Sequence, residues 1–309
     1  MRVLVAGATG AVGRPLVRRL RAAGHDVVGL CRTAESEARL AADGYESVRC
    51  DLADREATRA AVARAEPEVV VDQVTGLPSS FGSTRWSMAS FYDRYVELAE
   101  GGRRELHRAA VEAGARRYVL QSVAFVYDPG GDGPRTEEAA VLRDPPSPWD
   151  RVLPALFELE RQVLEGAPSG VVLRYGFFYG PGTNYAPGGR FFEDVRRGRY
   201  PLVGEARGQF SFIHVEDAAA AAVSAVERGT RVYNVVDDEP APLADWLPHY
   251  ARAIGAKPPR RVPRRLASLV AGPLVTYWAT EQPPVSNRRA VRELGRELTR
   301  PSWRQGLAE

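Results

Sequence analysis

Short apolar runs alternate with longer segments of helical periodicity along the chain. The first run, Val3–Ala6, precedes Gly13–Ala23, in which Leu16, Val17 and Leu20 recur at helical spacing. Strands that alternate with amphipathic helices predict a doubly wound, parallel α/β sheet. Further strands are predicted at Asp26–Leu30, Ser47–Cys50, Val69–Val71, Tyr118–Gln121, Val171–Tyr175 and Val232–Val236, and helices over 35–43, 55–65, 93–113, 156–164 and 217–227.

A glycine-rich turn joins the first strand to the first helix. A tight strand-to-helix reversal requires positive φ angles or missing Cβ atoms, and glycine supplies both. The amides and the dipole at the start of the helix attract phosphate oxygens. Because a strand precedes the turn and a helix follows it, we predict a dinucleotide site rather than a ligand-free reversal. The residues expected to contact the dinucleotide here are Gly7, Thr9, Gly10, Ala11, Val12 and Gly13.

The end of the second predicted strand indicates which dinucleotide binds. An NAD site usually has a carboxylate there for the ribose 2′-hydroxyl, whereas this chain has Cys31, Arg32 and Thr33. A guanidinium makes charge-assisted hydrogen bonds to a phosphate, so Arg32 and Thr33 favour NADP(H). The alternative is that Arg32 is an ordinary solvated arginine, because 41 of the 42 basic residues are arginines.

Composition and charge exclude several classes of protein. The chain has 309 residues, 44% of them apolar, which suffices for one main domain with a smaller lobe. No apolar run approaches the ~20 residues of a membrane span, and no leader precedes the first strand, so we expect a cytoplasmic protein. The net charge of +3 comes without a basic block and gives nucleic-acid binding little support. No metal-ligand spacing stands out, and the oligomeric state stays open.

Motifs spread over nearly the whole chain carry a resemblance to a known family. Together they resemble the extended short-chain dehydrogenase/reductases of the nucleotide-sugar epimerase/dehydratase type. This set is specific for fold and cofactor but not for substrate. The motifs are Gly7-x-x-Gly10-x-x-Gly13, Asp51-Leu52, the stretch from Ser122 to Val126-Tyr127, Leu173-Arg174-Tyr175 with Tyr179-Gly180-Pro181-Gly182, and Phe212-Ile-His214-Val-Glu-Asp217.

The resemblance implies a seven-stranded Rossmann domain with a small C-terminal lobe for substrate. The expected Rossmann domain covers 1–175, with core strands also from 208–237, and the expected lobe covers 176–207 and 238–309. Asp51 and Leu52 offer a carboxylate and a small apolar side chain that can flank an adenine ring. Cofactor contacts are expected at Asp51, Leu52, Gln73, Val74, Thr75, Ser122, Val123, Tyr175, Gly176, Phe177 and Phe178.

The chain departs from the resemblance at the implied Ser/Thr–Tyr–Lys catalytic set. The implied serine position falls on Val123, and the tyrosine and lysine positions fall on Val152 and Leu156. Lys257 is the single lysine, and residue 253 is alanine, so the chain contains no Tyr-x-x-x-Lys. A developing alkoxide therefore lacks its usual protein acid.

Two functions are compatible with that loss, and a third conflicts with it. We favour an NADPH-dependent ketoreductase similar to the triad-lacking ketoreductases of aromatic polyketide pathways, such as those of angucyclines. In that case, a phenol beside the substrate carbonyl can supply the proton. The alternatives are a non-catalytic NADP(H)-binding regulator and, third, a sugar-nucleotide epimerase or dehydratase, which needs the missing base.

The remaining candidates lie in predicted loops at the carboxyl edge of the sheet, where doubly wound folds bind ligands. Ser122, Asn184 and Tyr185 are weak candidates for a replacement catalytic group. Aromatic side chains there favour a small-molecule aromatic substrate, although some of these rings must instead belong to the core. The predicted substrate contacts are Phe81, Trp86, Tyr92, Trp149 and Tyr185.

Overall fold

A seven-stranded sheet forms the centre of the computed structural model, which describes residues 1–76, 85–295 and 297–308. The strand order is β11-β6-β5-β4-β1-β2-β3, and all neighbouring strands are parallel. This order confirms the predicted doubly wound fold. The strands are β1 (Arg2–Ala6), β2 (Asp26–Cys31), β3 (Glu46–Arg49), β4 (Val69–Asp72), β5 (Arg117–Val123), β6 (Ser169–Tyr175) and β11 (Val232–Val235).

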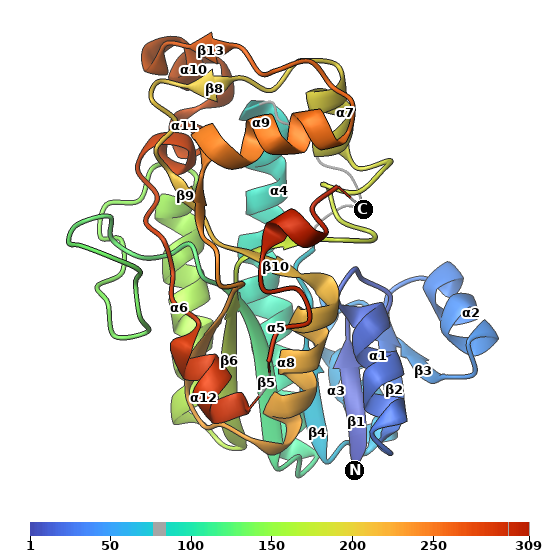
Figure 1. Cartoon of the computed structure of the whole chain (residues 1–309). Coiled ribbons are helices and arrows are strands. Elements are labelled where there is room, and N and C mark those ends of the chain that lie inside the picture. Colours follow the sequence, from blue (N-terminus) through green and yellow to red (C-terminus); the bar gives the residue numbers. More distant parts are fainter. Residues whose placement is uncertain (77–84, 296, 309) are drawn as a thin grey trace.

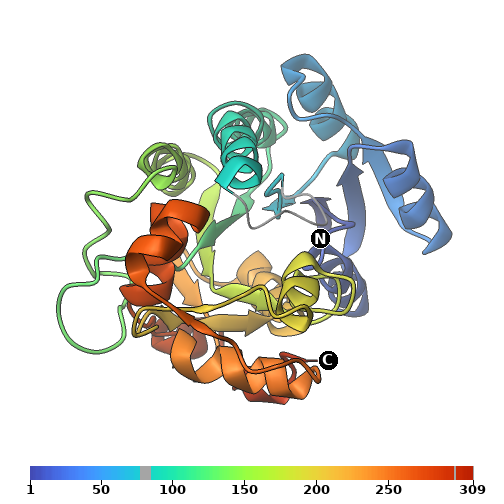
Figure 2. The ribbon, with the colours of Figure 1, turned by 90° about the horizontal axis from the view of Figure 1, so that it is seen from above.

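Helices cover both faces of this sheet (Figure 1). Figure 2 shows the sheet between the two helical layers. Within the described ranges, no helix combines the length and the hydrophobicity needed to cross a bilayer. One face carries α3 (Arg55–Ala65), α4 (Arg85–Glu97), α5 (Arg103–Glu112) and α6 (Trp149–Glu165), and the other carries α1 (Gly13–Ala22), α2 (Ala34–Ala42), α8 (Val215–Glu227) and α12 (Arg288–Leu294).

Helix α8 packs closely because its buried side chains are small. Residues 218–222 are all alanine and all buried. At the first turn of α8, Glu216 accepts hydrogen bonds from Arg18 and Arg19 of α1, at 2.5 and 3.0 Å. His214 caps the helix, because its Nδ1 accepts from the backbone N–H of Glu216. These contacts fix the position of α8 relative to α1.

A second group of short elements lies above the carboxyl edge of the sheet (Figure 1). Its core is rich in aromatic rings, with Phe212, Trp246 and Trp303 almost fully buried. The division into a domain and a substrate lobe stays a prediction; within the range 238–309, α12 packs against β11 and α8 rather than this aromatic core. The elements are β7 (Phe177–Tyr179), α7 (Arg190–Arg196), β8 (Leu202–Val203), β9 (Gln209–Phe210), β10 (Phe212–His214), β12 (Ala241–Pro242), α9 (Leu243–Ala253), β13 (Arg261–Val262), α10 (Arg264–Ala271), α11 (Pro273–Thr280) and a 3-10 turn at Trp303–Gln305.

The helix that follows β4 starts earlier than predicted. We expected a loop up to residue 92, but α4 begins at Arg85 and continues through a π-helical turn, Leu98–Gly102, into α5. Tyr92, Tyr95 and Ala99 are buried at helical spacing, which extends the apolar face upstream of the predicted start. Aromatic residues that we expected on a loop therefore belong to a helix.

Asp237 is a buried carboxyl group directly after β11. Its side chain is 1% exposed, and its Oδ1 accepts a long, 3.4 Å, hydrogen bond from the backbone N–H of Glu239. Burial raises the pKa of Asp237 to about 9. The carboxyl group is therefore held protonated at neutral pH, which costs free energy relative to the ionised group in the unfolded chain.

We expect Asp237→Asn to stabilise the protein increasingly as pH rises. The folded-state pKa lies above the unfolded value of about 3.9, so the wild type loses stability between that value and about pH 9. Asparagine keeps the shape and cannot ionise. The gain in melting temperature over wild type should be larger at pH 8 than at pH 5. Asp238→Asn, at the exposed neighbour, is the control, and an equal gain at both pH values contradicts the prediction.

Candidate functional site

The turn between β1 and α1 has the geometry of a pyrophosphate cradle. Gly7 has a φ of +80°, and the N–H of Gly10 donates to the carbonyl of Gly7 at 3.0 Å. A Cβ at Gly13 would lie 2.1 Å from the Gly7 oxygen, and one at Gly7 would lie 2.9 Å from the carbonyl oxygen of Gln73. Larger side chains do not fit at these positions, so the backbone itself is the surface offered to a ligand.

The start of α1 has no side-chain cap that would compete with such a ligand; in its first turn the N–H of Arg14 donates to the carbonyl of Gly10, and Pro15 has no N–H. Val12 at the N-cap makes no side-chain cap, and the first turn holds no acidic residue. Uncapped amides at a helix start attract an anion. Thr9 and Ala11, both half-buried, lie in the same turn, and a Cβ on Gly182, in the loop after β7, would lie 3.8 Å from Ala11. These residues fit a dinucleotide diphosphate.

The end of β2 and the start of α2 lie beside the glycine turn between β1 and α1. Arg32 is exposed and forms no ion pair with the part of the chain that the structure describes. Thr33 caps α2 by accepting from the backbone N–H of Ser36, and the Ser36 hydroxyl lies 3.5 Å from that of Thr9. A cation, three hydroxyl groups and a helix start therefore surround one small area, which suits a phosphate group.

The two residues that we predict to flank an adenine ring, Asp51 and Leu52, lie just after the end of β3. Asp51 is exposed, and its carboxylate accepts from the N–H of Ala53 at 3.1 Å. Leu52 is buried under the π-helical turn, where a Cβ on Gly102 would lie 2.6 Å from the Leu52 oxygen. The structure thus places an open carboxylate beside a fixed apolar residue at this edge.

A buried ion pair holds the end of β4. Arg103 donates from Nε to Asp72 at 2.8 Å, with the two side chains 1% and 0% exposed. The other Asp72 oxygen accepts from the N–H of Val74 at 2.9 Å, which shapes the turn that contains Gln73 and Thr75. Breaking a buried pair costs about 3–5 kcal/mol. The sequence did not indicate this pair, because its partners are thirty-one positions apart.

Ser122 lies inside a polar network rather than at an open surface. Its hydroxyl donates to Glu160 at 2.5 Å, and the serine is 1% exposed. Glu160 also accepts two hydrogen bonds from Arg174 of β6, at 3.0 and 2.5 Å. The Arg174 guanidinium donates in turn to the hydroxyl of Tyr127, which donates to Asn234. This arrangement orients Ser122 toward α6, and the hydroxyl is engaged there.

Apolar side chains occupy the positions where the resemblance implies a catalytic set. Val152 and Leu156 are buried in α6, at 3% and 0% exposure, and pack in the core between α6 and the sheet. Val123 is half-buried at the end of β5. None of these three side chains can donate or accept a proton.

The end of β6 comes close to the upper elements. A Cβ on Gly176 would lie 2.2 Å from the carbonyl oxygen of Ser211, so this crossing requires glycine. Phe177 and Phe178 follow, half-buried, and the N–H of Phe177 donates to the Ser211 oxygen. Tyr175 is fully buried, and its hydroxyl donates to the carbonyl of Ala218. Backbone and rings of this stretch therefore border the carboxyl edge.

The two candidates for a replacement acid on the loop after β7 have different environments. Tyr185 is half-buried among Phe212, Trp246 and Tyr250, and burial raises its pKa well above the usual value. A raised pKa makes a tyrosine a weaker acid. Asn184 is half-buried, and its side-chain oxygen has no hydrogen-bond partner among the described residues.

Of the predicted substrate contacts, Tyr185 lies on a loop, whereas Tyr92 and Trp149 do not. Tyr92 lies in α4 at 7% exposure, and Trp149 begins α6 at 2% exposure, so both are core residues. Burial raises the pKa of Tyr92 as well. Phe81 lies outside the described residues, and Trp86 lies in α4 with a side chain that is likewise outside the description. The expectation that Tyr92 and Trp149 line an open loop was wrong.

Other rings do reach the carboxyl edge. Phe125 follows β5 and is half-buried, and its ring stacks on that of Phe177 with centroids 4.4 Å apart. Trp278 of α11, also half-buried, contacts both rings. Sequence reasoning missed Phe125 and Trp278 because they are 153 positions apart and only tertiary folding brings them together.

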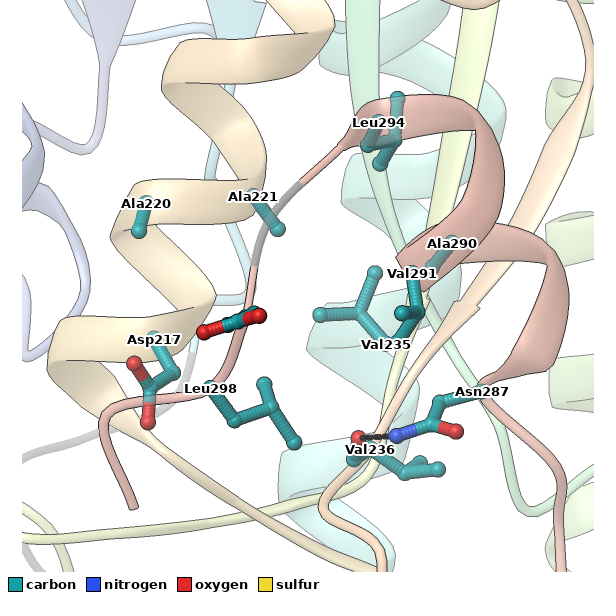
Figure 3. Close-up of a pocket in the computed structure, with 11 residues that line it drawn as sticks. Asp217, Ala220, Ala221, Val235, Val236, Asn287, Ala290, Val291, Leu294 and Leu298 are labelled. Carbon is teal, nitrogen blue, oxygen red and sulfur yellow. Dashed lines mark hydrogen bonds between the residues drawn. The ribbon is translucent and has the colours of Figure 1, made fainter. Parts of the chain in front are cut away.

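The hollows elsewhere in the structure do not involve the predicted site. A cavity of about 30 Å³ lies between α8, β11 and α12, where Ala221, Val235 and Ala290 line it (Figure 3). That volume suits one or two waters. A wider hollow of about 490 Å³ contains His25 and Glu227, near the amino-terminal edge of the sheet. The described residues contain no group of three or more His, Cys, Asp or Glu arranged to hold a metal.

Fold and site together define a dinucleotide-binding Rossmann protein. The model of the NAD dependent epimerase/dehydratase family matches residues 3–235, so the chain belongs to that family. The resemblance stated from the motifs is thereby confirmed, and membership of this family supports binding of a nicotinamide dinucleotide.

Three known proteins show the range of similarity. The chain is 45% identical to a 3-diazoavenalumate denitrifying reductase from a Streptomyces species, over 99% of both chains. It is 27% identical to a 4-hydroxy-2-methyl-3-oxo-4-farnesyl-3,4-dihydroquinoline-1-oxide ketoreductase from Stigmatella aurantiaca, over 97% of this chain and 88% of that one. A human epimerase family protein solved with NADPH has a TM-score of 0.76 at 21% identity, over 99% and 98% of the two chains, which shows a shared fold.

Proposed function

We propose that the protein is an NADPH-dependent reductase of a planar aromatic substrate that uses no proton donor of its own at the reaction centre. The observation that carries this proposal is the apolar character of Val123, Val152 and Leu156, where the family resemblance implies the serine, tyrosine and lysine. The names of the reductase relatives support catalysis over a purely regulatory role. An epimerase needs the base that these positions lack.

The chain's own residues bind and orient the cofactor. NADPH, when bound, supplies a hydride to the substrate. The glycine turn and the uncapped start of α1 hold the diphosphate, and Arg32, with Ser36 and Thr33, binds the 2′-phosphate. The stretch from Gly176 to Phe178 and the end of β5 border the reaction centre and exclude water from it.

An aryl ketone with a neighbouring phenol fits this centre. The phenol is hydrogen-bonded to the carbonyl oxygen and passes its proton to that oxygen as negative charge develops there. The resulting phenolate is more stable than an alkoxide and regains a proton from water after release. The protein then has only to position the ring and keep water out.

An aromatic diazonium compound is the second candidate, because the relative at 45% identity is named as a denitrifying reductase of a diazo compound. Addition of one hydride to an aryldiazonium cation and loss of dinitrogen gives a neutral arene. Charge and atoms balance without any proton. This reaction therefore needs no protein acid, which also agrees with an apolar reaction centre.

We expect Arg32→Ala to reduce the preference for NADPH over NADH by about 1–3 kcal/mol, the size of hydrogen bonds to charged groups. Calorimetry with both cofactors measures this preference. Arg39→Ala, on the exposed side of the nearby helix α2 and paired with Glu35, should leave it unchanged. Equal affinities of the wild type for NADPH and NADH would refute a 2′-phosphate site at Arg32.

Tyr185→Phe should change turnover by less than about tenfold. Burial raises the pKa of the Tyr185 hydroxyl, and the charged forms of Tyr200 and Tyr250, rather than a lysine, are the groups that act on it, so it is not an obligatory acid. General acid–base catalysis contributes ~10²–10⁴-fold. A loss of that size in steady-state kinetics, with normal cofactor affinity, would identify Tyr185 as a relocated acid.

Three substrates test the proposed reaction. 8-Hydroxy-1-tetralone should be reduced, and 8-methoxy-1-tetralone should bind but turn over far more slowly, because methylation removes the internal proton. With an ortho-hydroxybenzenediazonium salt and NADPH deuterated at nicotinamide C4, deuterium should appear in the phenol as dinitrogen is released. Equal turnover of both tetralones refutes substrate-assisted protonation, and no cofactor oxidation with any of the three refutes the reductase.

A further inference from the structure

Three roughly parallel aromatic rings form a row at the carboxyl edge of the sheet. Phe125 stacks on Phe177 with centroids 4.4 Å apart and an angle of 11° between the rings. Phe125 also stacks on Trp149, with centroids 5.3 Å apart and an angle of 28° between the rings. Offset stacking at these distances is favourable beyond simple burial. The three rings therefore have a defined orientation relative to one another.

A fourth ring, Trp278 of α11, stands across this row. It meets Phe125, Phe177 and Trp149 edge to face, at 5.8, 6.0 and 5.5 Å and at angles between 83° and 87°. Trp278 also packs against two hydrophobic cores, the one between the sheet and helices α3 to α6 and the aromatic core of the upper elements. This ring therefore connects the two cores.

These rings are not completely covered, and one of them has an unused donor. Phe125, Phe177 and Trp278 are each half-buried, unlike Trp149, which is 2% exposed. The indole Nε1 of Trp278 is buried and finds no hydrogen-bond partner among the residues that the structure describes. A buried donor without an acceptor costs about as much free energy as a lost hydrogen bond. An acceptor on a ligand would remove that cost.

The position of the row along the chain connects it to the cofactor. Phe125 lies two residues after Val123, at the end of β5, and Phe177 directly follows Gly176, at the end of β6. Both stretches belong to the predicted cofactor edge. A molecule that touches these rings is therefore beside the reaction centre.

We propose that Phe125, Phe177 and Trp278 form the aromatic wall that binds the ring system of the substrate, and that the indole N–H of Trp278 donates to a polar substituent on that ring. This inference rests on the proposed reductase function and adds the substrate-binding residues. All three side chains are uncharged and half-buried, so part of each ring is left uncovered by its ring neighbours. They favour a planar aromatic ring over a sugar, whose hydroxyls would lose their partners on such a surface.

Binding to the NADP⁺-loaded protein tests the wall without turnover. The probes are 8-hydroxy-1-tetralone and an ortho-hydroxybenzenediazonium salt, and the dissociation constants come from calorimetry or ligand-observed NMR. Trp278→Ala should weaken binding of the tetralone by at least about tenfold, and Phe125→Ala by a similar factor. Trp278→Phe keeps a ring and removes the N–H, so we expect a loss of about 2–10-fold.

Trp246→Phe is the matched control, because its indole N–H also lacks a partner among the described residues but its ring is 1% exposed and packs on Phe210 and Phe212 rather than on the wall. It should leave tetralone binding within about twofold of wild type. Affinity for NADP⁺ should be unchanged in every variant. Melting temperatures confirm that each variant is folded, and Trp278→Phe carries the test if Trp278→Ala does not fold.

Two results overturn the aromatic wall. One is tetralone binding by folded Trp278 and Phe125 variants that matches the wild type. The other is a wild type that binds neither probe. If the wild type binds in a manner that depends on Trp278 but oxidises no NADPH with any substrate, the proposed reaction fails and the wall stands. If turnover occurs and is insensitive to Trp278, the reaction stands and the wall fails.

Discussion

The lack of a side chain at Gly13 is the constraint on which the rest of the structure depends. A Cβ there would lie 2.1 Å from the carbonyl oxygen of Gly7, so any other residue would push α1 away from β1. The position of α1 sets that of α8 through Arg18, Arg19 and Glu216. The residue that caps α8, His214, lies against Gly180, whose loop returns to lie near Ala11 in the same turn. The close approach of Gly13 to Gly7 thus fixes the relative positions of α1, α8 and the loop after β7 around the glycine turn.

Much of the Rossmann half could be predicted from the sequence, because its signals are local. Strand β4 has four buried residues in a row, and α1 repeats its apolar residues at helical spacing, so neighbours along the chain suffice to define them. The start of α4 could not be found this way. Its aromatic content suggested a loop, and the buried spacing of Tyr92, Tyr95 and Ala99 becomes apparent only against the sheet.

The residues of the candidate site also fall into those that the sequence could predict and those that it could not. The glycine turn was predictable, since strand, glycines and helix are contiguous, whereas Phe125 and Trp278 meet through folding of distant segments. Glu160 of α6 belongs to the buried polar network around Ser122. Its role as the acceptor for both Ser122 and Arg174 follows from the packing of α6 on β5 and β6, which no local pattern encodes.

In the proposals made above, the cofactor and the substrate are held by different parts of the polypeptide. The glycine turn, with its missing Cβ atoms, forms the proposed cofactor site, and a few uncharged rings from β7, α11 and the segment after β5 form the proposed substrate site. Replacing one ring alters the second site and leaves the first intact. A lineage can therefore acquire a new substrate through very few mutations while it inherits its redox partner unchanged, and relatives that differ in what they reduce are the expected evolutionary result.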